Sequence, residues 1–292
     1  MMSSLHIIQS PNKDFDVRKL VTRIKMSSSE RKARLKENAI FLDEYQERLY
    51  SEARQSLLIV FQAMDAAGKD STIRAVFSGM NPQGFLVSSF KQPSKRELAH
   101  DYLWRVSQQL PVRGRIGVFN RSHYEEVLVC KVHPKYLMYQ NILGLNDPAQ
   151  ADSAFWTGRY QSINNFEKHL SQNGYRIIKF FLNVSQKEQE KRFLRRMNRP
   201  EKHWKFSIGD LEERQLWDNY MAAYSDALRA TSTDHAPWFA IPADDKDYMQ
   251  ATVSDIVKST LLDMDPKYPK VDADLIKEIE EARLILAAEK KG

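Results

Sequence analysis

Five short apolar runs alternate with helical stretches along the 292 residues, and this alternation limits the folds that the chain can adopt. Neighbouring parallel strands need a long crossover connection, usually a helix, whereas antiparallel strands can be joined by a tight turn. We therefore predict βαβ units that form a mostly parallel sheet covered by helices on both faces, within one large α/β domain. The expected strands cover residues 56–62, 86–90, 115–120, 175–184 and 238–241.

Helical periodicity fills most of the chain between these strands. The expected helices cover residues 30–54, 70–80, 95–109, a stretch from about 122, 152–173, 186–197, 210–230, 247–262 and 272–291. Residues 1–28 are polar and irregular, so we expect an N-terminal arm there, a single domain over 29–270, and a C-terminal helix over 271–292. No apolar run approaches the roughly 20 residues that span a bilayer, and Cys130 is the only cysteine. We expect a cytoplasmic protein without disulfides or a membrane partner.

The segment after the first strand is typical of a phosphate-binding loop. AMDAAGK, residues 63–69, lies between a predicted strand and a predicted helix. Backbone N–H groups of small residues, the helix N-terminus and the Lys69 ammonium group can all hold phosphate oxygens. The match to G-x-x-x-x-G-K-[ST] is incomplete, because Ala63 replaces the first glycine and Asp70 replaces the hydroxyl residue. A turn with a helix cap is the alternative. The predicted phosphate-binding residues of the loop are Ala66, Ala67, Gly68, Lys69, Asp70, Ser71 and Thr72.

Asp65 is an unusual residue inside such a loop. Phosphates would repel its carboxylate unless a cation lies between them, so we predict a magnesium ligand, bound directly or through water. Capping of the following helix is the alternative.

Polar residues also follow the third strand, where ligands bind in open parallel sheets. Asn120 takes the place of the acid that usually holds the magnesium shell, and Glu125 can supply that charge instead. Arg121 can clamp a phosphate with two parallel hydrogen bonds, or it can form a local ion pair with Glu125. We assign His123 to packing or hydrogen bonding, because it has no second metal ligand at a suitable spacing.

The positive charge of the chain is concentrated in one segment. The chain carries a net charge of +6, and residues 191–205 alone hold seven basic residues against one acid. This distribution excludes a general nucleic-acid coat and favours one local basic device. We predict a lid over residues 186–210 that closes on phosphates, with an RNA-binding patch or a solvated helix as alternatives. Its predicted phosphate-binding residues are Arg192, Arg195, Arg196, Arg199, Lys202 and Lys205.

Four segments in order resemble the polyphosphate kinase 2 family. They are FQAMDAAGKDST and GVFNRSHYEE, which are similar to its Walker A and Walker B segments, KRFLRRMNRPEKHWKFSIGDLEER, which is similar to its lid, and PWFAIPADDK. The similarity covers about residues 12–265. It implies reversible phosphoryl transfer between inorganic polyphosphate and nucleotides, with Mg²⁺ or alternatively Mn²⁺. It also implies a P-loop kinase fold like that of thymidylate kinase, a three-layer α/β/α sandwich around a five-stranded parallel sheet. A homo-oligomer, dimer or tetramer, is expected as well.

The resemblance also assigns roles to single residues. Asp65, Gly68 and Lys69 match the family's phosphate loop, and Asn120, Arg121 and Glu125 match its second motif. This version of the second motif is similar to the class III group that accepts both AMP and ADP. We therefore expect conversion of AMP through ADP to ATP, with guanine nucleotides as a further option. The rival hypotheses are an ATP-dependent nucleoside monophosphate kinase of the same fold and a non-catalytic protein that binds polyanions or RNA.

Overall fold

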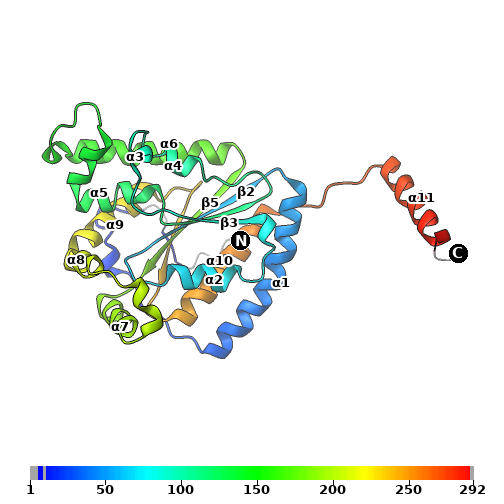
Figure 1. Ribbon diagram of the computed structural model, residues 1–292, viewed down its shortest axis with the longest axis horizontal. Helices are drawn as coiled ribbons and strands as arrows, with labels where there is room; N and C mark the ends of the chain where they lie inside the picture. The colour runs from blue at the N-terminus through cyan, green and yellow to red at the C-terminus, as the bar shows by residue number, and fades with distance from the viewer. Residues whose placement is uncertain (1–5, 9–10, 290–292) are drawn as a thin grey trace.

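A six-stranded sheet forms the centre of the molecule (Figure 1). The structure, a computed structural model, describes residues 6–8 and 11–289. The strands follow the order β1-β6-β5-β2-β4-β3, and each pair is parallel except β1 with β6. They are β1 (Ile7–Ile8), β2 (Ser56–Gln62), β3 (Phe85–Ser89), β4 (Ile116–Asn120), β5 (Tyr175–Asn183) and β6 (Trp238–Pro242).

The expected count of five strands was wrong by one, since β1 adds an antiparallel edge strand. Two residues are too few to show the periodicity by which a strand is recognised in a sequence. Besides the pairing of β1 with β6, the predicted N-terminal arm contacts the domain at a second place. Val17 in the short 3₁₀ helix η1 (Val17–Lys19) is fully buried, and its N–H donates to Ser225 Oγ at 3.1 Å.

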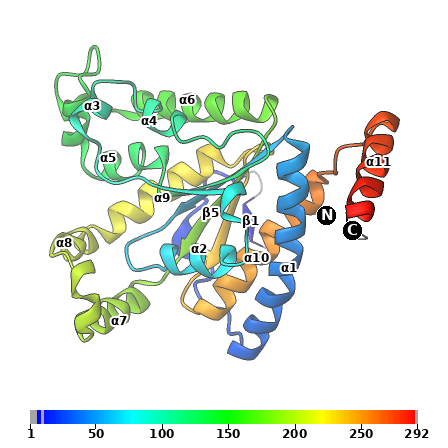
Figure 2. The same cartoon turned by 45° about the vertical axis from the view of Figure 1, so that its right-hand side comes forward.

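Helices cover both faces of the sheet, which confirms the three-layer arrangement (Figure 2). One face carries α1 (Ser28–Glu52), α2 (Lys69–Phe77) and α10 (Lys246–Met264), which contact one another. The other carries α6 (Ser153–Gln172) and α9 (Trp217–Thr231). Because both faces are covered, a central strand has no solvent side, and every residue of β2 is buried.

Three predicted helices are divided in the structure. The stretch 95–109 forms α3 (Lys95–Leu98) and α4 (Trp104–Ser107), because the Asp101 carboxylate accepts from the Leu103 N–H and closes a turn between them. The stretch from 122 forms η3 (His123–Glu126) and α5 (Val129–Val132), and 210–230 forms α8 (Gly209–Gln215) and α9. The remaining elements are η2 (Pro82–Gly84), η4 (Pro134–Gln140), η5 (Pro148–Gln150), α7 (Gln186–Met197), η6 (Pro200–Lys205) and α11 (Ala273–Glu289).

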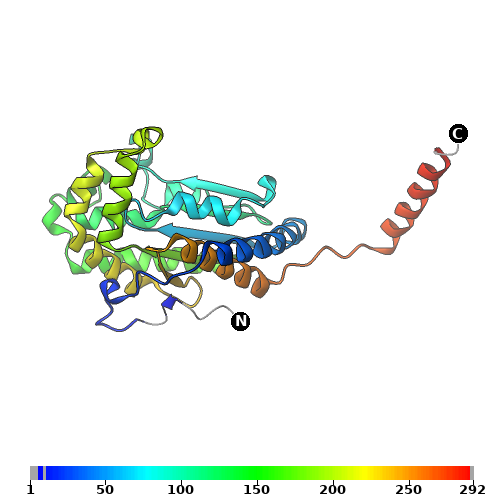
Figure 3. The ribbon, with the colours of Figure 1, turned by 90° about the horizontal axis from the view of Figure 1, so that it is seen from below.

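The register of the sheet brings the predicted site segments together. Phe61 in β2 is paired with Asn120 in β4, and β5 pairs with β2 on its other side. The phosphate loop after β2, the segment after β4 and helix α7 after β5 therefore all begin at the carboxyl edge of one sheet. Helix α11 lies away from this body (Figure 3). Among the described residues, no helix has the length and apolar content needed to cross a membrane.

Candidate functional site

The loop between β2 and α2 has the backbone of a phosphate-binding loop. Ala66 and Gly68 adopt positive φ angles of 59° and 113°. A side chain at Gly68 would also meet Met249 Cε at 3.1 Å, so both its conformation and its surroundings favour glycine. Helix α2 begins at Lys69, directly after this turn. Its first N–H groups and its dipole therefore face the loop, where an anion would bind.

Lys69 is buried beside the loop, with 8% of the residue exposed. Its Nζ donates to the carbonyl oxygens of Ala63 at 2.8 Å and Met64 at 3.5 Å, and forms no ion pair with a carboxylate of the described residues. Burial, and after it the charge of Arg121, lowers the pKa of Lys69. The Lys69 Nζ is therefore held in place by neutral partners, at a position where it can contact a ligand.

Arg121 lies between the two predicted magnesium ligands. Its guanidinium is 2.8 Å from Asp65 Oδ1 and 3.7 Å from Glu125 Oε2. The backbone of Arg121 has a φ of 64°, and its N–H donates to the Phe61 carbonyl at 3.0 Å. The side chain of Glu125 is 16% exposed, and its partial burial raises the pKa of its carboxyl group, although Arg121 opposes this effect. The local ion pair that the sequence left open is therefore present, and it joins Asp65 to the segment after β4.

Asp70 connects this core of the site to the lid. Its carboxylate accepts from Asn120 Nδ2 at 2.9 Å and from Lys205 Nζ at 2.9 Å. Partial burial opposes ionisation of Asp70, but these two hydrogen bonds lower its pKa. Asn120 thus contacts the start of α2, and Lys205 bridges from η6 to the same carboxylate.

A large cleft of 1230 Å³ runs between the phosphate loop and the lid. Eleven basic residues line it against two carboxylates, those of Asp65 and Asp70. Every predicted lid cation is among them, as are Arg74, Lys91 and Lys246, which the sequence analysis missed. Motif spacing does not reveal these three, because they follow different strands or lie further along α2. The basic residues are Lys69, Arg74, Lys91, Arg121, Arg192, Arg195, Arg196, Arg199, Lys202, Lys205 and Lys246.

Arg192 differs from the other lid cations. It is 5% exposed, and its guanidinium donates to the carbonyl oxygens of Ala67 at 2.5 Å, Ala66 at 3.2 Å and Ala243 at 2.6 Å. It also pairs with Glu188 at 3.0 Å. These contacts fasten α7 to the phosphate loop, so most of its hydrogen-bonding capacity is already used within the protein.

The remaining lid cations fall into two groups. Arg196 is 2.9 Å from Asp210 and Lys205 is 2.9 Å from Asp70, so both have carboxylate partners. Arg195, Arg199 and Lys202 line the cleft, and their side chains make no hydrogen bond or ion pair within the part of the chain that the structure describes. Unpaired cations in a cleft are available to a polyanion.

A second cavity of 290 Å³ adjoins the first, and the two share Asp65, Lys91, Gln92 and Arg121. Its wall combines aromatic and polar groups. They include Tyr136, Tyr139, Tyr220, Tyr224, Gln140 and Glu126. The sequence does not reveal this cavity, because its residues come from segments far apart in the chain and share no spacing that a motif could show.

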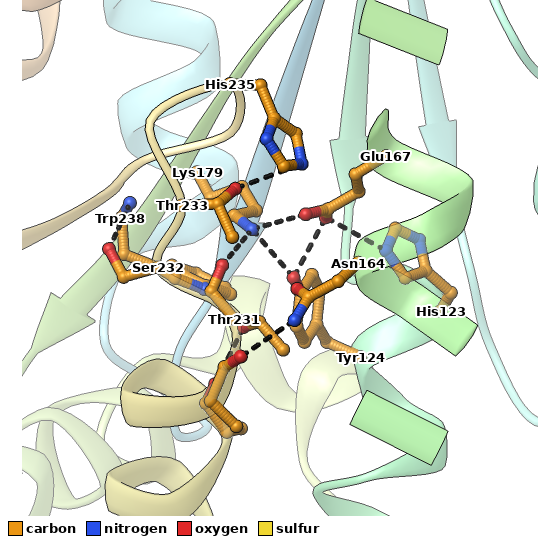
Figure 4. A network of polar contacts seen from close by, with 12 residues as sticks. His123, Tyr124, Asn164, Glu167, Lys179, Thr231, Ser232, Thr233, His235 and Trp238 are labelled. Carbon is orange, nitrogen blue, oxygen red and sulfur yellow. Dashed lines mark hydrogen bonds and ion pairs between the residues drawn. The ribbon is translucent and has the colours of Figure 1, made fainter. Parts of the chain in front are cut away.

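His123 and Tyr124, which follow Arg121 in the chain, belong to a network of polar contacts (Figure 4). Lys179 Nζ donates to Glu167 at 2.6 Å, to Tyr124 Oη at 2.8 Å and to the Thr231 carbonyl at 2.8 Å. His123 Nε2 lies 3.3 Å from Glu167, which agrees with the hydrogen-bonding role expected of His123. The network holds His123 and Tyr124 between Arg121 and Glu125, so it supports the segment that carries both side chains.

The acidic residues of the site suit magnesium only as a partial ligand set. Among the described residues, no cluster of three or more His, Cys, Asp or Glu side chains could hold a metal ion by itself. Mg²⁺ is usually bound by one or two carboxylates together with water and substrate phosphates. Asp65 and Glu125 lie on either side of Arg121 and line the smaller cavity, so they fit a site that is completed by phosphate oxygens.

Comparison with known proteins identifies the family. The family model described as polyphosphate kinase 2 matches residues 25–269. The chain belongs to the polyphosphate kinase 2 family. It is 51% identical, over 83% of each chain, to an ADP-polyphosphate phosphotransferase of Rhodopseudomonas palustris. It is 48% identical, over 78% of its own length and 80% of the relative, to an AMP/ADP-polyphosphate phosphotransferase of Meiothermus ruber.

Solved structures agree with this result. A crystal structure of polyphosphate kinase 2 from Arthrobacter aurescens has a TM-score of 0.83 and 37% identity, with 94% of each chain covered. The P-loop kinase fold expected from the sequence is thereby confirmed.

Proposed function

We propose that this protein is a polyphosphate-dependent nucleotide kinase that transfers the terminal phosphoryl group of inorganic polyphosphate to AMP and to ADP. One observation carries the proposal: a cation-lined cleft and a smaller aromatic cavity meet at Asp65 and Arg121. Relatives named ADP-polyphosphate and AMP/ADP-polyphosphate phosphotransferase support it. The products are ADP and ATP, and the reaction is reversible.

The large cleft suits the polyphosphate donor. Polyphosphate carries about one negative charge per phosphate, so a run of lysine and arginine side chains can replace its counterions, as proteins do on nucleic acids. Arg195, Arg199 and Lys202 have no partner among the described residues and would hold the chain, while Lys69 and the loop amides would hold its terminal phosphate. Lys69 lines the large cleft and not the smaller cavity, which supports placing the donor on the phosphate loop.

The smaller cavity suits the acceptor nucleotide. Tyr136, Tyr139, Tyr220 and Tyr224 offer aromatic surface for a nucleoside, and Arg121 offers charge for its terminal phosphate. Adenine nucleotides are the proposed acceptors, and guanine nucleotides are the further option.

The chemical step then needs position and charge rather than a protein nucleophile. An oxygen of the acceptor's terminal phosphate attacks the terminal phosphorus of polyphosphate in line. A new P–O bond forms, the bond to the bridging oxygen breaks, and the shortened polyphosphate keeps that oxygen with its electron pair. Lys69 and Arg121 would stabilise the charge on the transferring group. Mg²⁺, or Mn²⁺ in its place, would be held by Asp65 and Glu125, and would neutralise phosphate charge.

Product analysis tests the proposal directly. The protein is incubated with AMP, polyphosphate and Mg²⁺, and the nucleotides are separated by chromatography over time. We expect ADP first and ATP later, with a total yield that scales with the polyphosphate added. Product that requires ATP instead of polyphosphate would favour a nucleoside monophosphate kinase, and binding of polyphosphate without turnover would favour a non-catalytic polyanion-binding protein.

We retain two further proposals from the sequence. The protein is cytoplasmic, with which its single, buried cysteine agrees. It is also a homo-oligomer, and helix α11 offers a surface for association.

A further inference from the structure

Helix α11 is an exposed helix outside the family domain. The polyphosphate kinase 2 model ends at residue 269, and α11 covers Ala273–Glu289. Figures 1 and 3 show it apart from the body, beyond a connection that carries no regular structure. None of its residues is buried. Most of the stability of a helix in a protein comes from the packing of its apolar face, so we expect α11 to have a packing partner.

One face of α11 has the pattern of a coiled-coil seam. Leu275, Ile279, Ala282 and Leu286 follow one another at spacings of four, three and four residues. This spacing assigns Ile279 and Leu286 to heptad position a, and Leu275 and Ala282 to position d. The three large side chains are between 41% and 61% exposed, so the seam is uncovered. Ile279 at position a and Leu275 at position d match the pattern that favours two strands, whereas Leu286 and Ala282 do not.

The charges that flank the seam select one partner and one orientation. Glu278 falls at position g on one border, and Arg283 at position e on the other. In a parallel pair, a g residue faces the e residue that lies five positions further along the partner helix, and Arg283 is five positions after Glu278. Two copies of α11 side by side would therefore form this ion pair twice. An antiparallel pair would instead bring like borders together, with Glu278 facing the side that carries the second Glu278.

We propose that α11 pairs in parallel with α11 of a second copy of this chain, as a short two-stranded coiled coil that joins two kinase domains. Charge complementarity with itself is the reason for choosing a second copy over the chain's own body or another protein. The proposal is independent of the catalytic function, because it uses no residue of the cleft.

Disulfide trapping tests the pairing in the full chain. Ala282→Cys places a thiol on the seam, and Leu284→Cys is the matched control, because position f points away from a partner. The natural Cys130 is buried, so the unaltered chain gives the background. On mild oxidation and non-reducing electrophoresis, we expect about tenfold more covalent dimer from Ala282→Cys than from Leu284→Cys, since disulfides form only over short Cα distances. Equal yields, or no dimer from either variant, would overturn the proposal.

A charge exchange then tests the orientation. In the Ala282→Cys chain, Glu278→Arg alone should lower the dimer yield, because it places two arginines opposite each other on each side. Glu278→Arg together with Arg283→Glu should restore the yield, because the pairs form again with reversed signs. A double variant that stays as low as Glu278→Arg would show that these residues do not face each other, which would refute parallel pairing of α11.

Discussion

Two lysines of this protein are buried close to the segment after β4, and they differ in the partners of their ammonium groups. Lys179 is fully buried and bonds to Glu167, Tyr124 and the Thr231 carbonyl, so all three of its protons have acceptors. Lys69 is almost as buried, but it bonds only to carbonyl oxygens of its own loop. The difference lies in the partner charge, which the protein supplies for Lys179 and does not supply in contact with Lys69.

This difference distinguishes a structural charge from a functional one. Burial opposes ionisation of both partners and lowers the pKa of Lys179, but Lys179 and His123 hold the pKa of Glu167 below its usual value. For Lys69, burial and Arg121 lower the pKa, Asp65, Glu125 and Asp70 oppose this through space, and no carboxylate of the described residues contacts it. A buried ammonium group without a contacting anion, at the end of a cleft, indicates that the compensating charge arrives with the substrate.

The largest effect is expected from breaking the structural pair. Lys179→Met leaves the carboxylate of Glu167 buried without its partner and should lower the free energy of unfolding by about 3–5 kcal/mol. Urea unfolding followed by circular dichroism measures this change. The double variant Lys179→Met with Glu167→Gln should recover much of the loss, because no unpaired charge remains. A Lys179→Met variant as stable as the parent would show that the charge of Lys179 does not stabilise the fold.

Removal of the functional lysine should act on turnover instead. Lys69→Ala should lower kcat by about a hundredfold or more, as loss of a charge contact made in the transition state does. Its free energy of unfolding should change little, because Lys69 gives up only bonds to carbonyl groups. Initial rates with polyphosphate and ADP, measured beside urea unfolding, separate the two quantities. Near-normal turnover would contradict the assignment of Lys69.

Exchanging the side chains at Asn120 and Glu125 tests whether the groups around Arg121 determine which acceptor is used. The double variant Asn120→Asp with Glu125→Asn removes one of the two carboxylates that position Arg121. AMP has a single phosphate to place against this arginine, so its kcat/KM should fall roughly tenfold more than that of ADP. The comparison needs both nucleotides at one polyphosphate concentration. An equal loss for AMP and ADP would show that these positions do not select the acceptor.

The smallest effect concerns a third lysine, Lys246, which lines the large cleft. Burial, with Arg192 and Arg195, lowers the pKa of Lys246 to about 8. Below pH 8 the side chain is charged and attracts phosphates; above pH 8 it is neutral until a bound polyanion raises its pKa. The KM for polyphosphate should therefore rise through pH 8 by roughly threefold, as expected for one partly exposed charge contact.

Lys246→Met is the control for this pH dependence. The variant should keep a raised KM at low pH and lose the change near pH 8. A parent and a variant with the same pH profile would show that Lys246 does not contact the polyphosphate.

Local signals predicted the parts of the fold and site that lie within one segment. Helix α7 has the predicted bounds, because Ser185 caps its start and Pro200 follows its end. The sequence also suggested the groups around Arg121, since the carboxyl ends of parallel strands meet at one edge. It could not suggest the tyrosine-lined cavity, whose residues meet only after folding. Nor could the sequence distinguish Arg192 from Arg195. Both arginines lie in the predicted lid, and their different partners are known only from the folded structure.

The contacts of Arg192 have a consequence for how this enzyme can change over time. Its guanidinium binds the carbonyl groups of Ala66 and Ala67, so the direction of those peptide units depends on a residue more than a hundred positions later. The opposite edge of the peptide unit between Ala67 and Gly68 carries the Gly68 N–H group, which can meet a phosphate. Recombination between relatives that exchanged the lid without the loop would separate the two halves of this arrangement. Loop and lid should therefore be inherited, and transplanted into chimeras, as a single module.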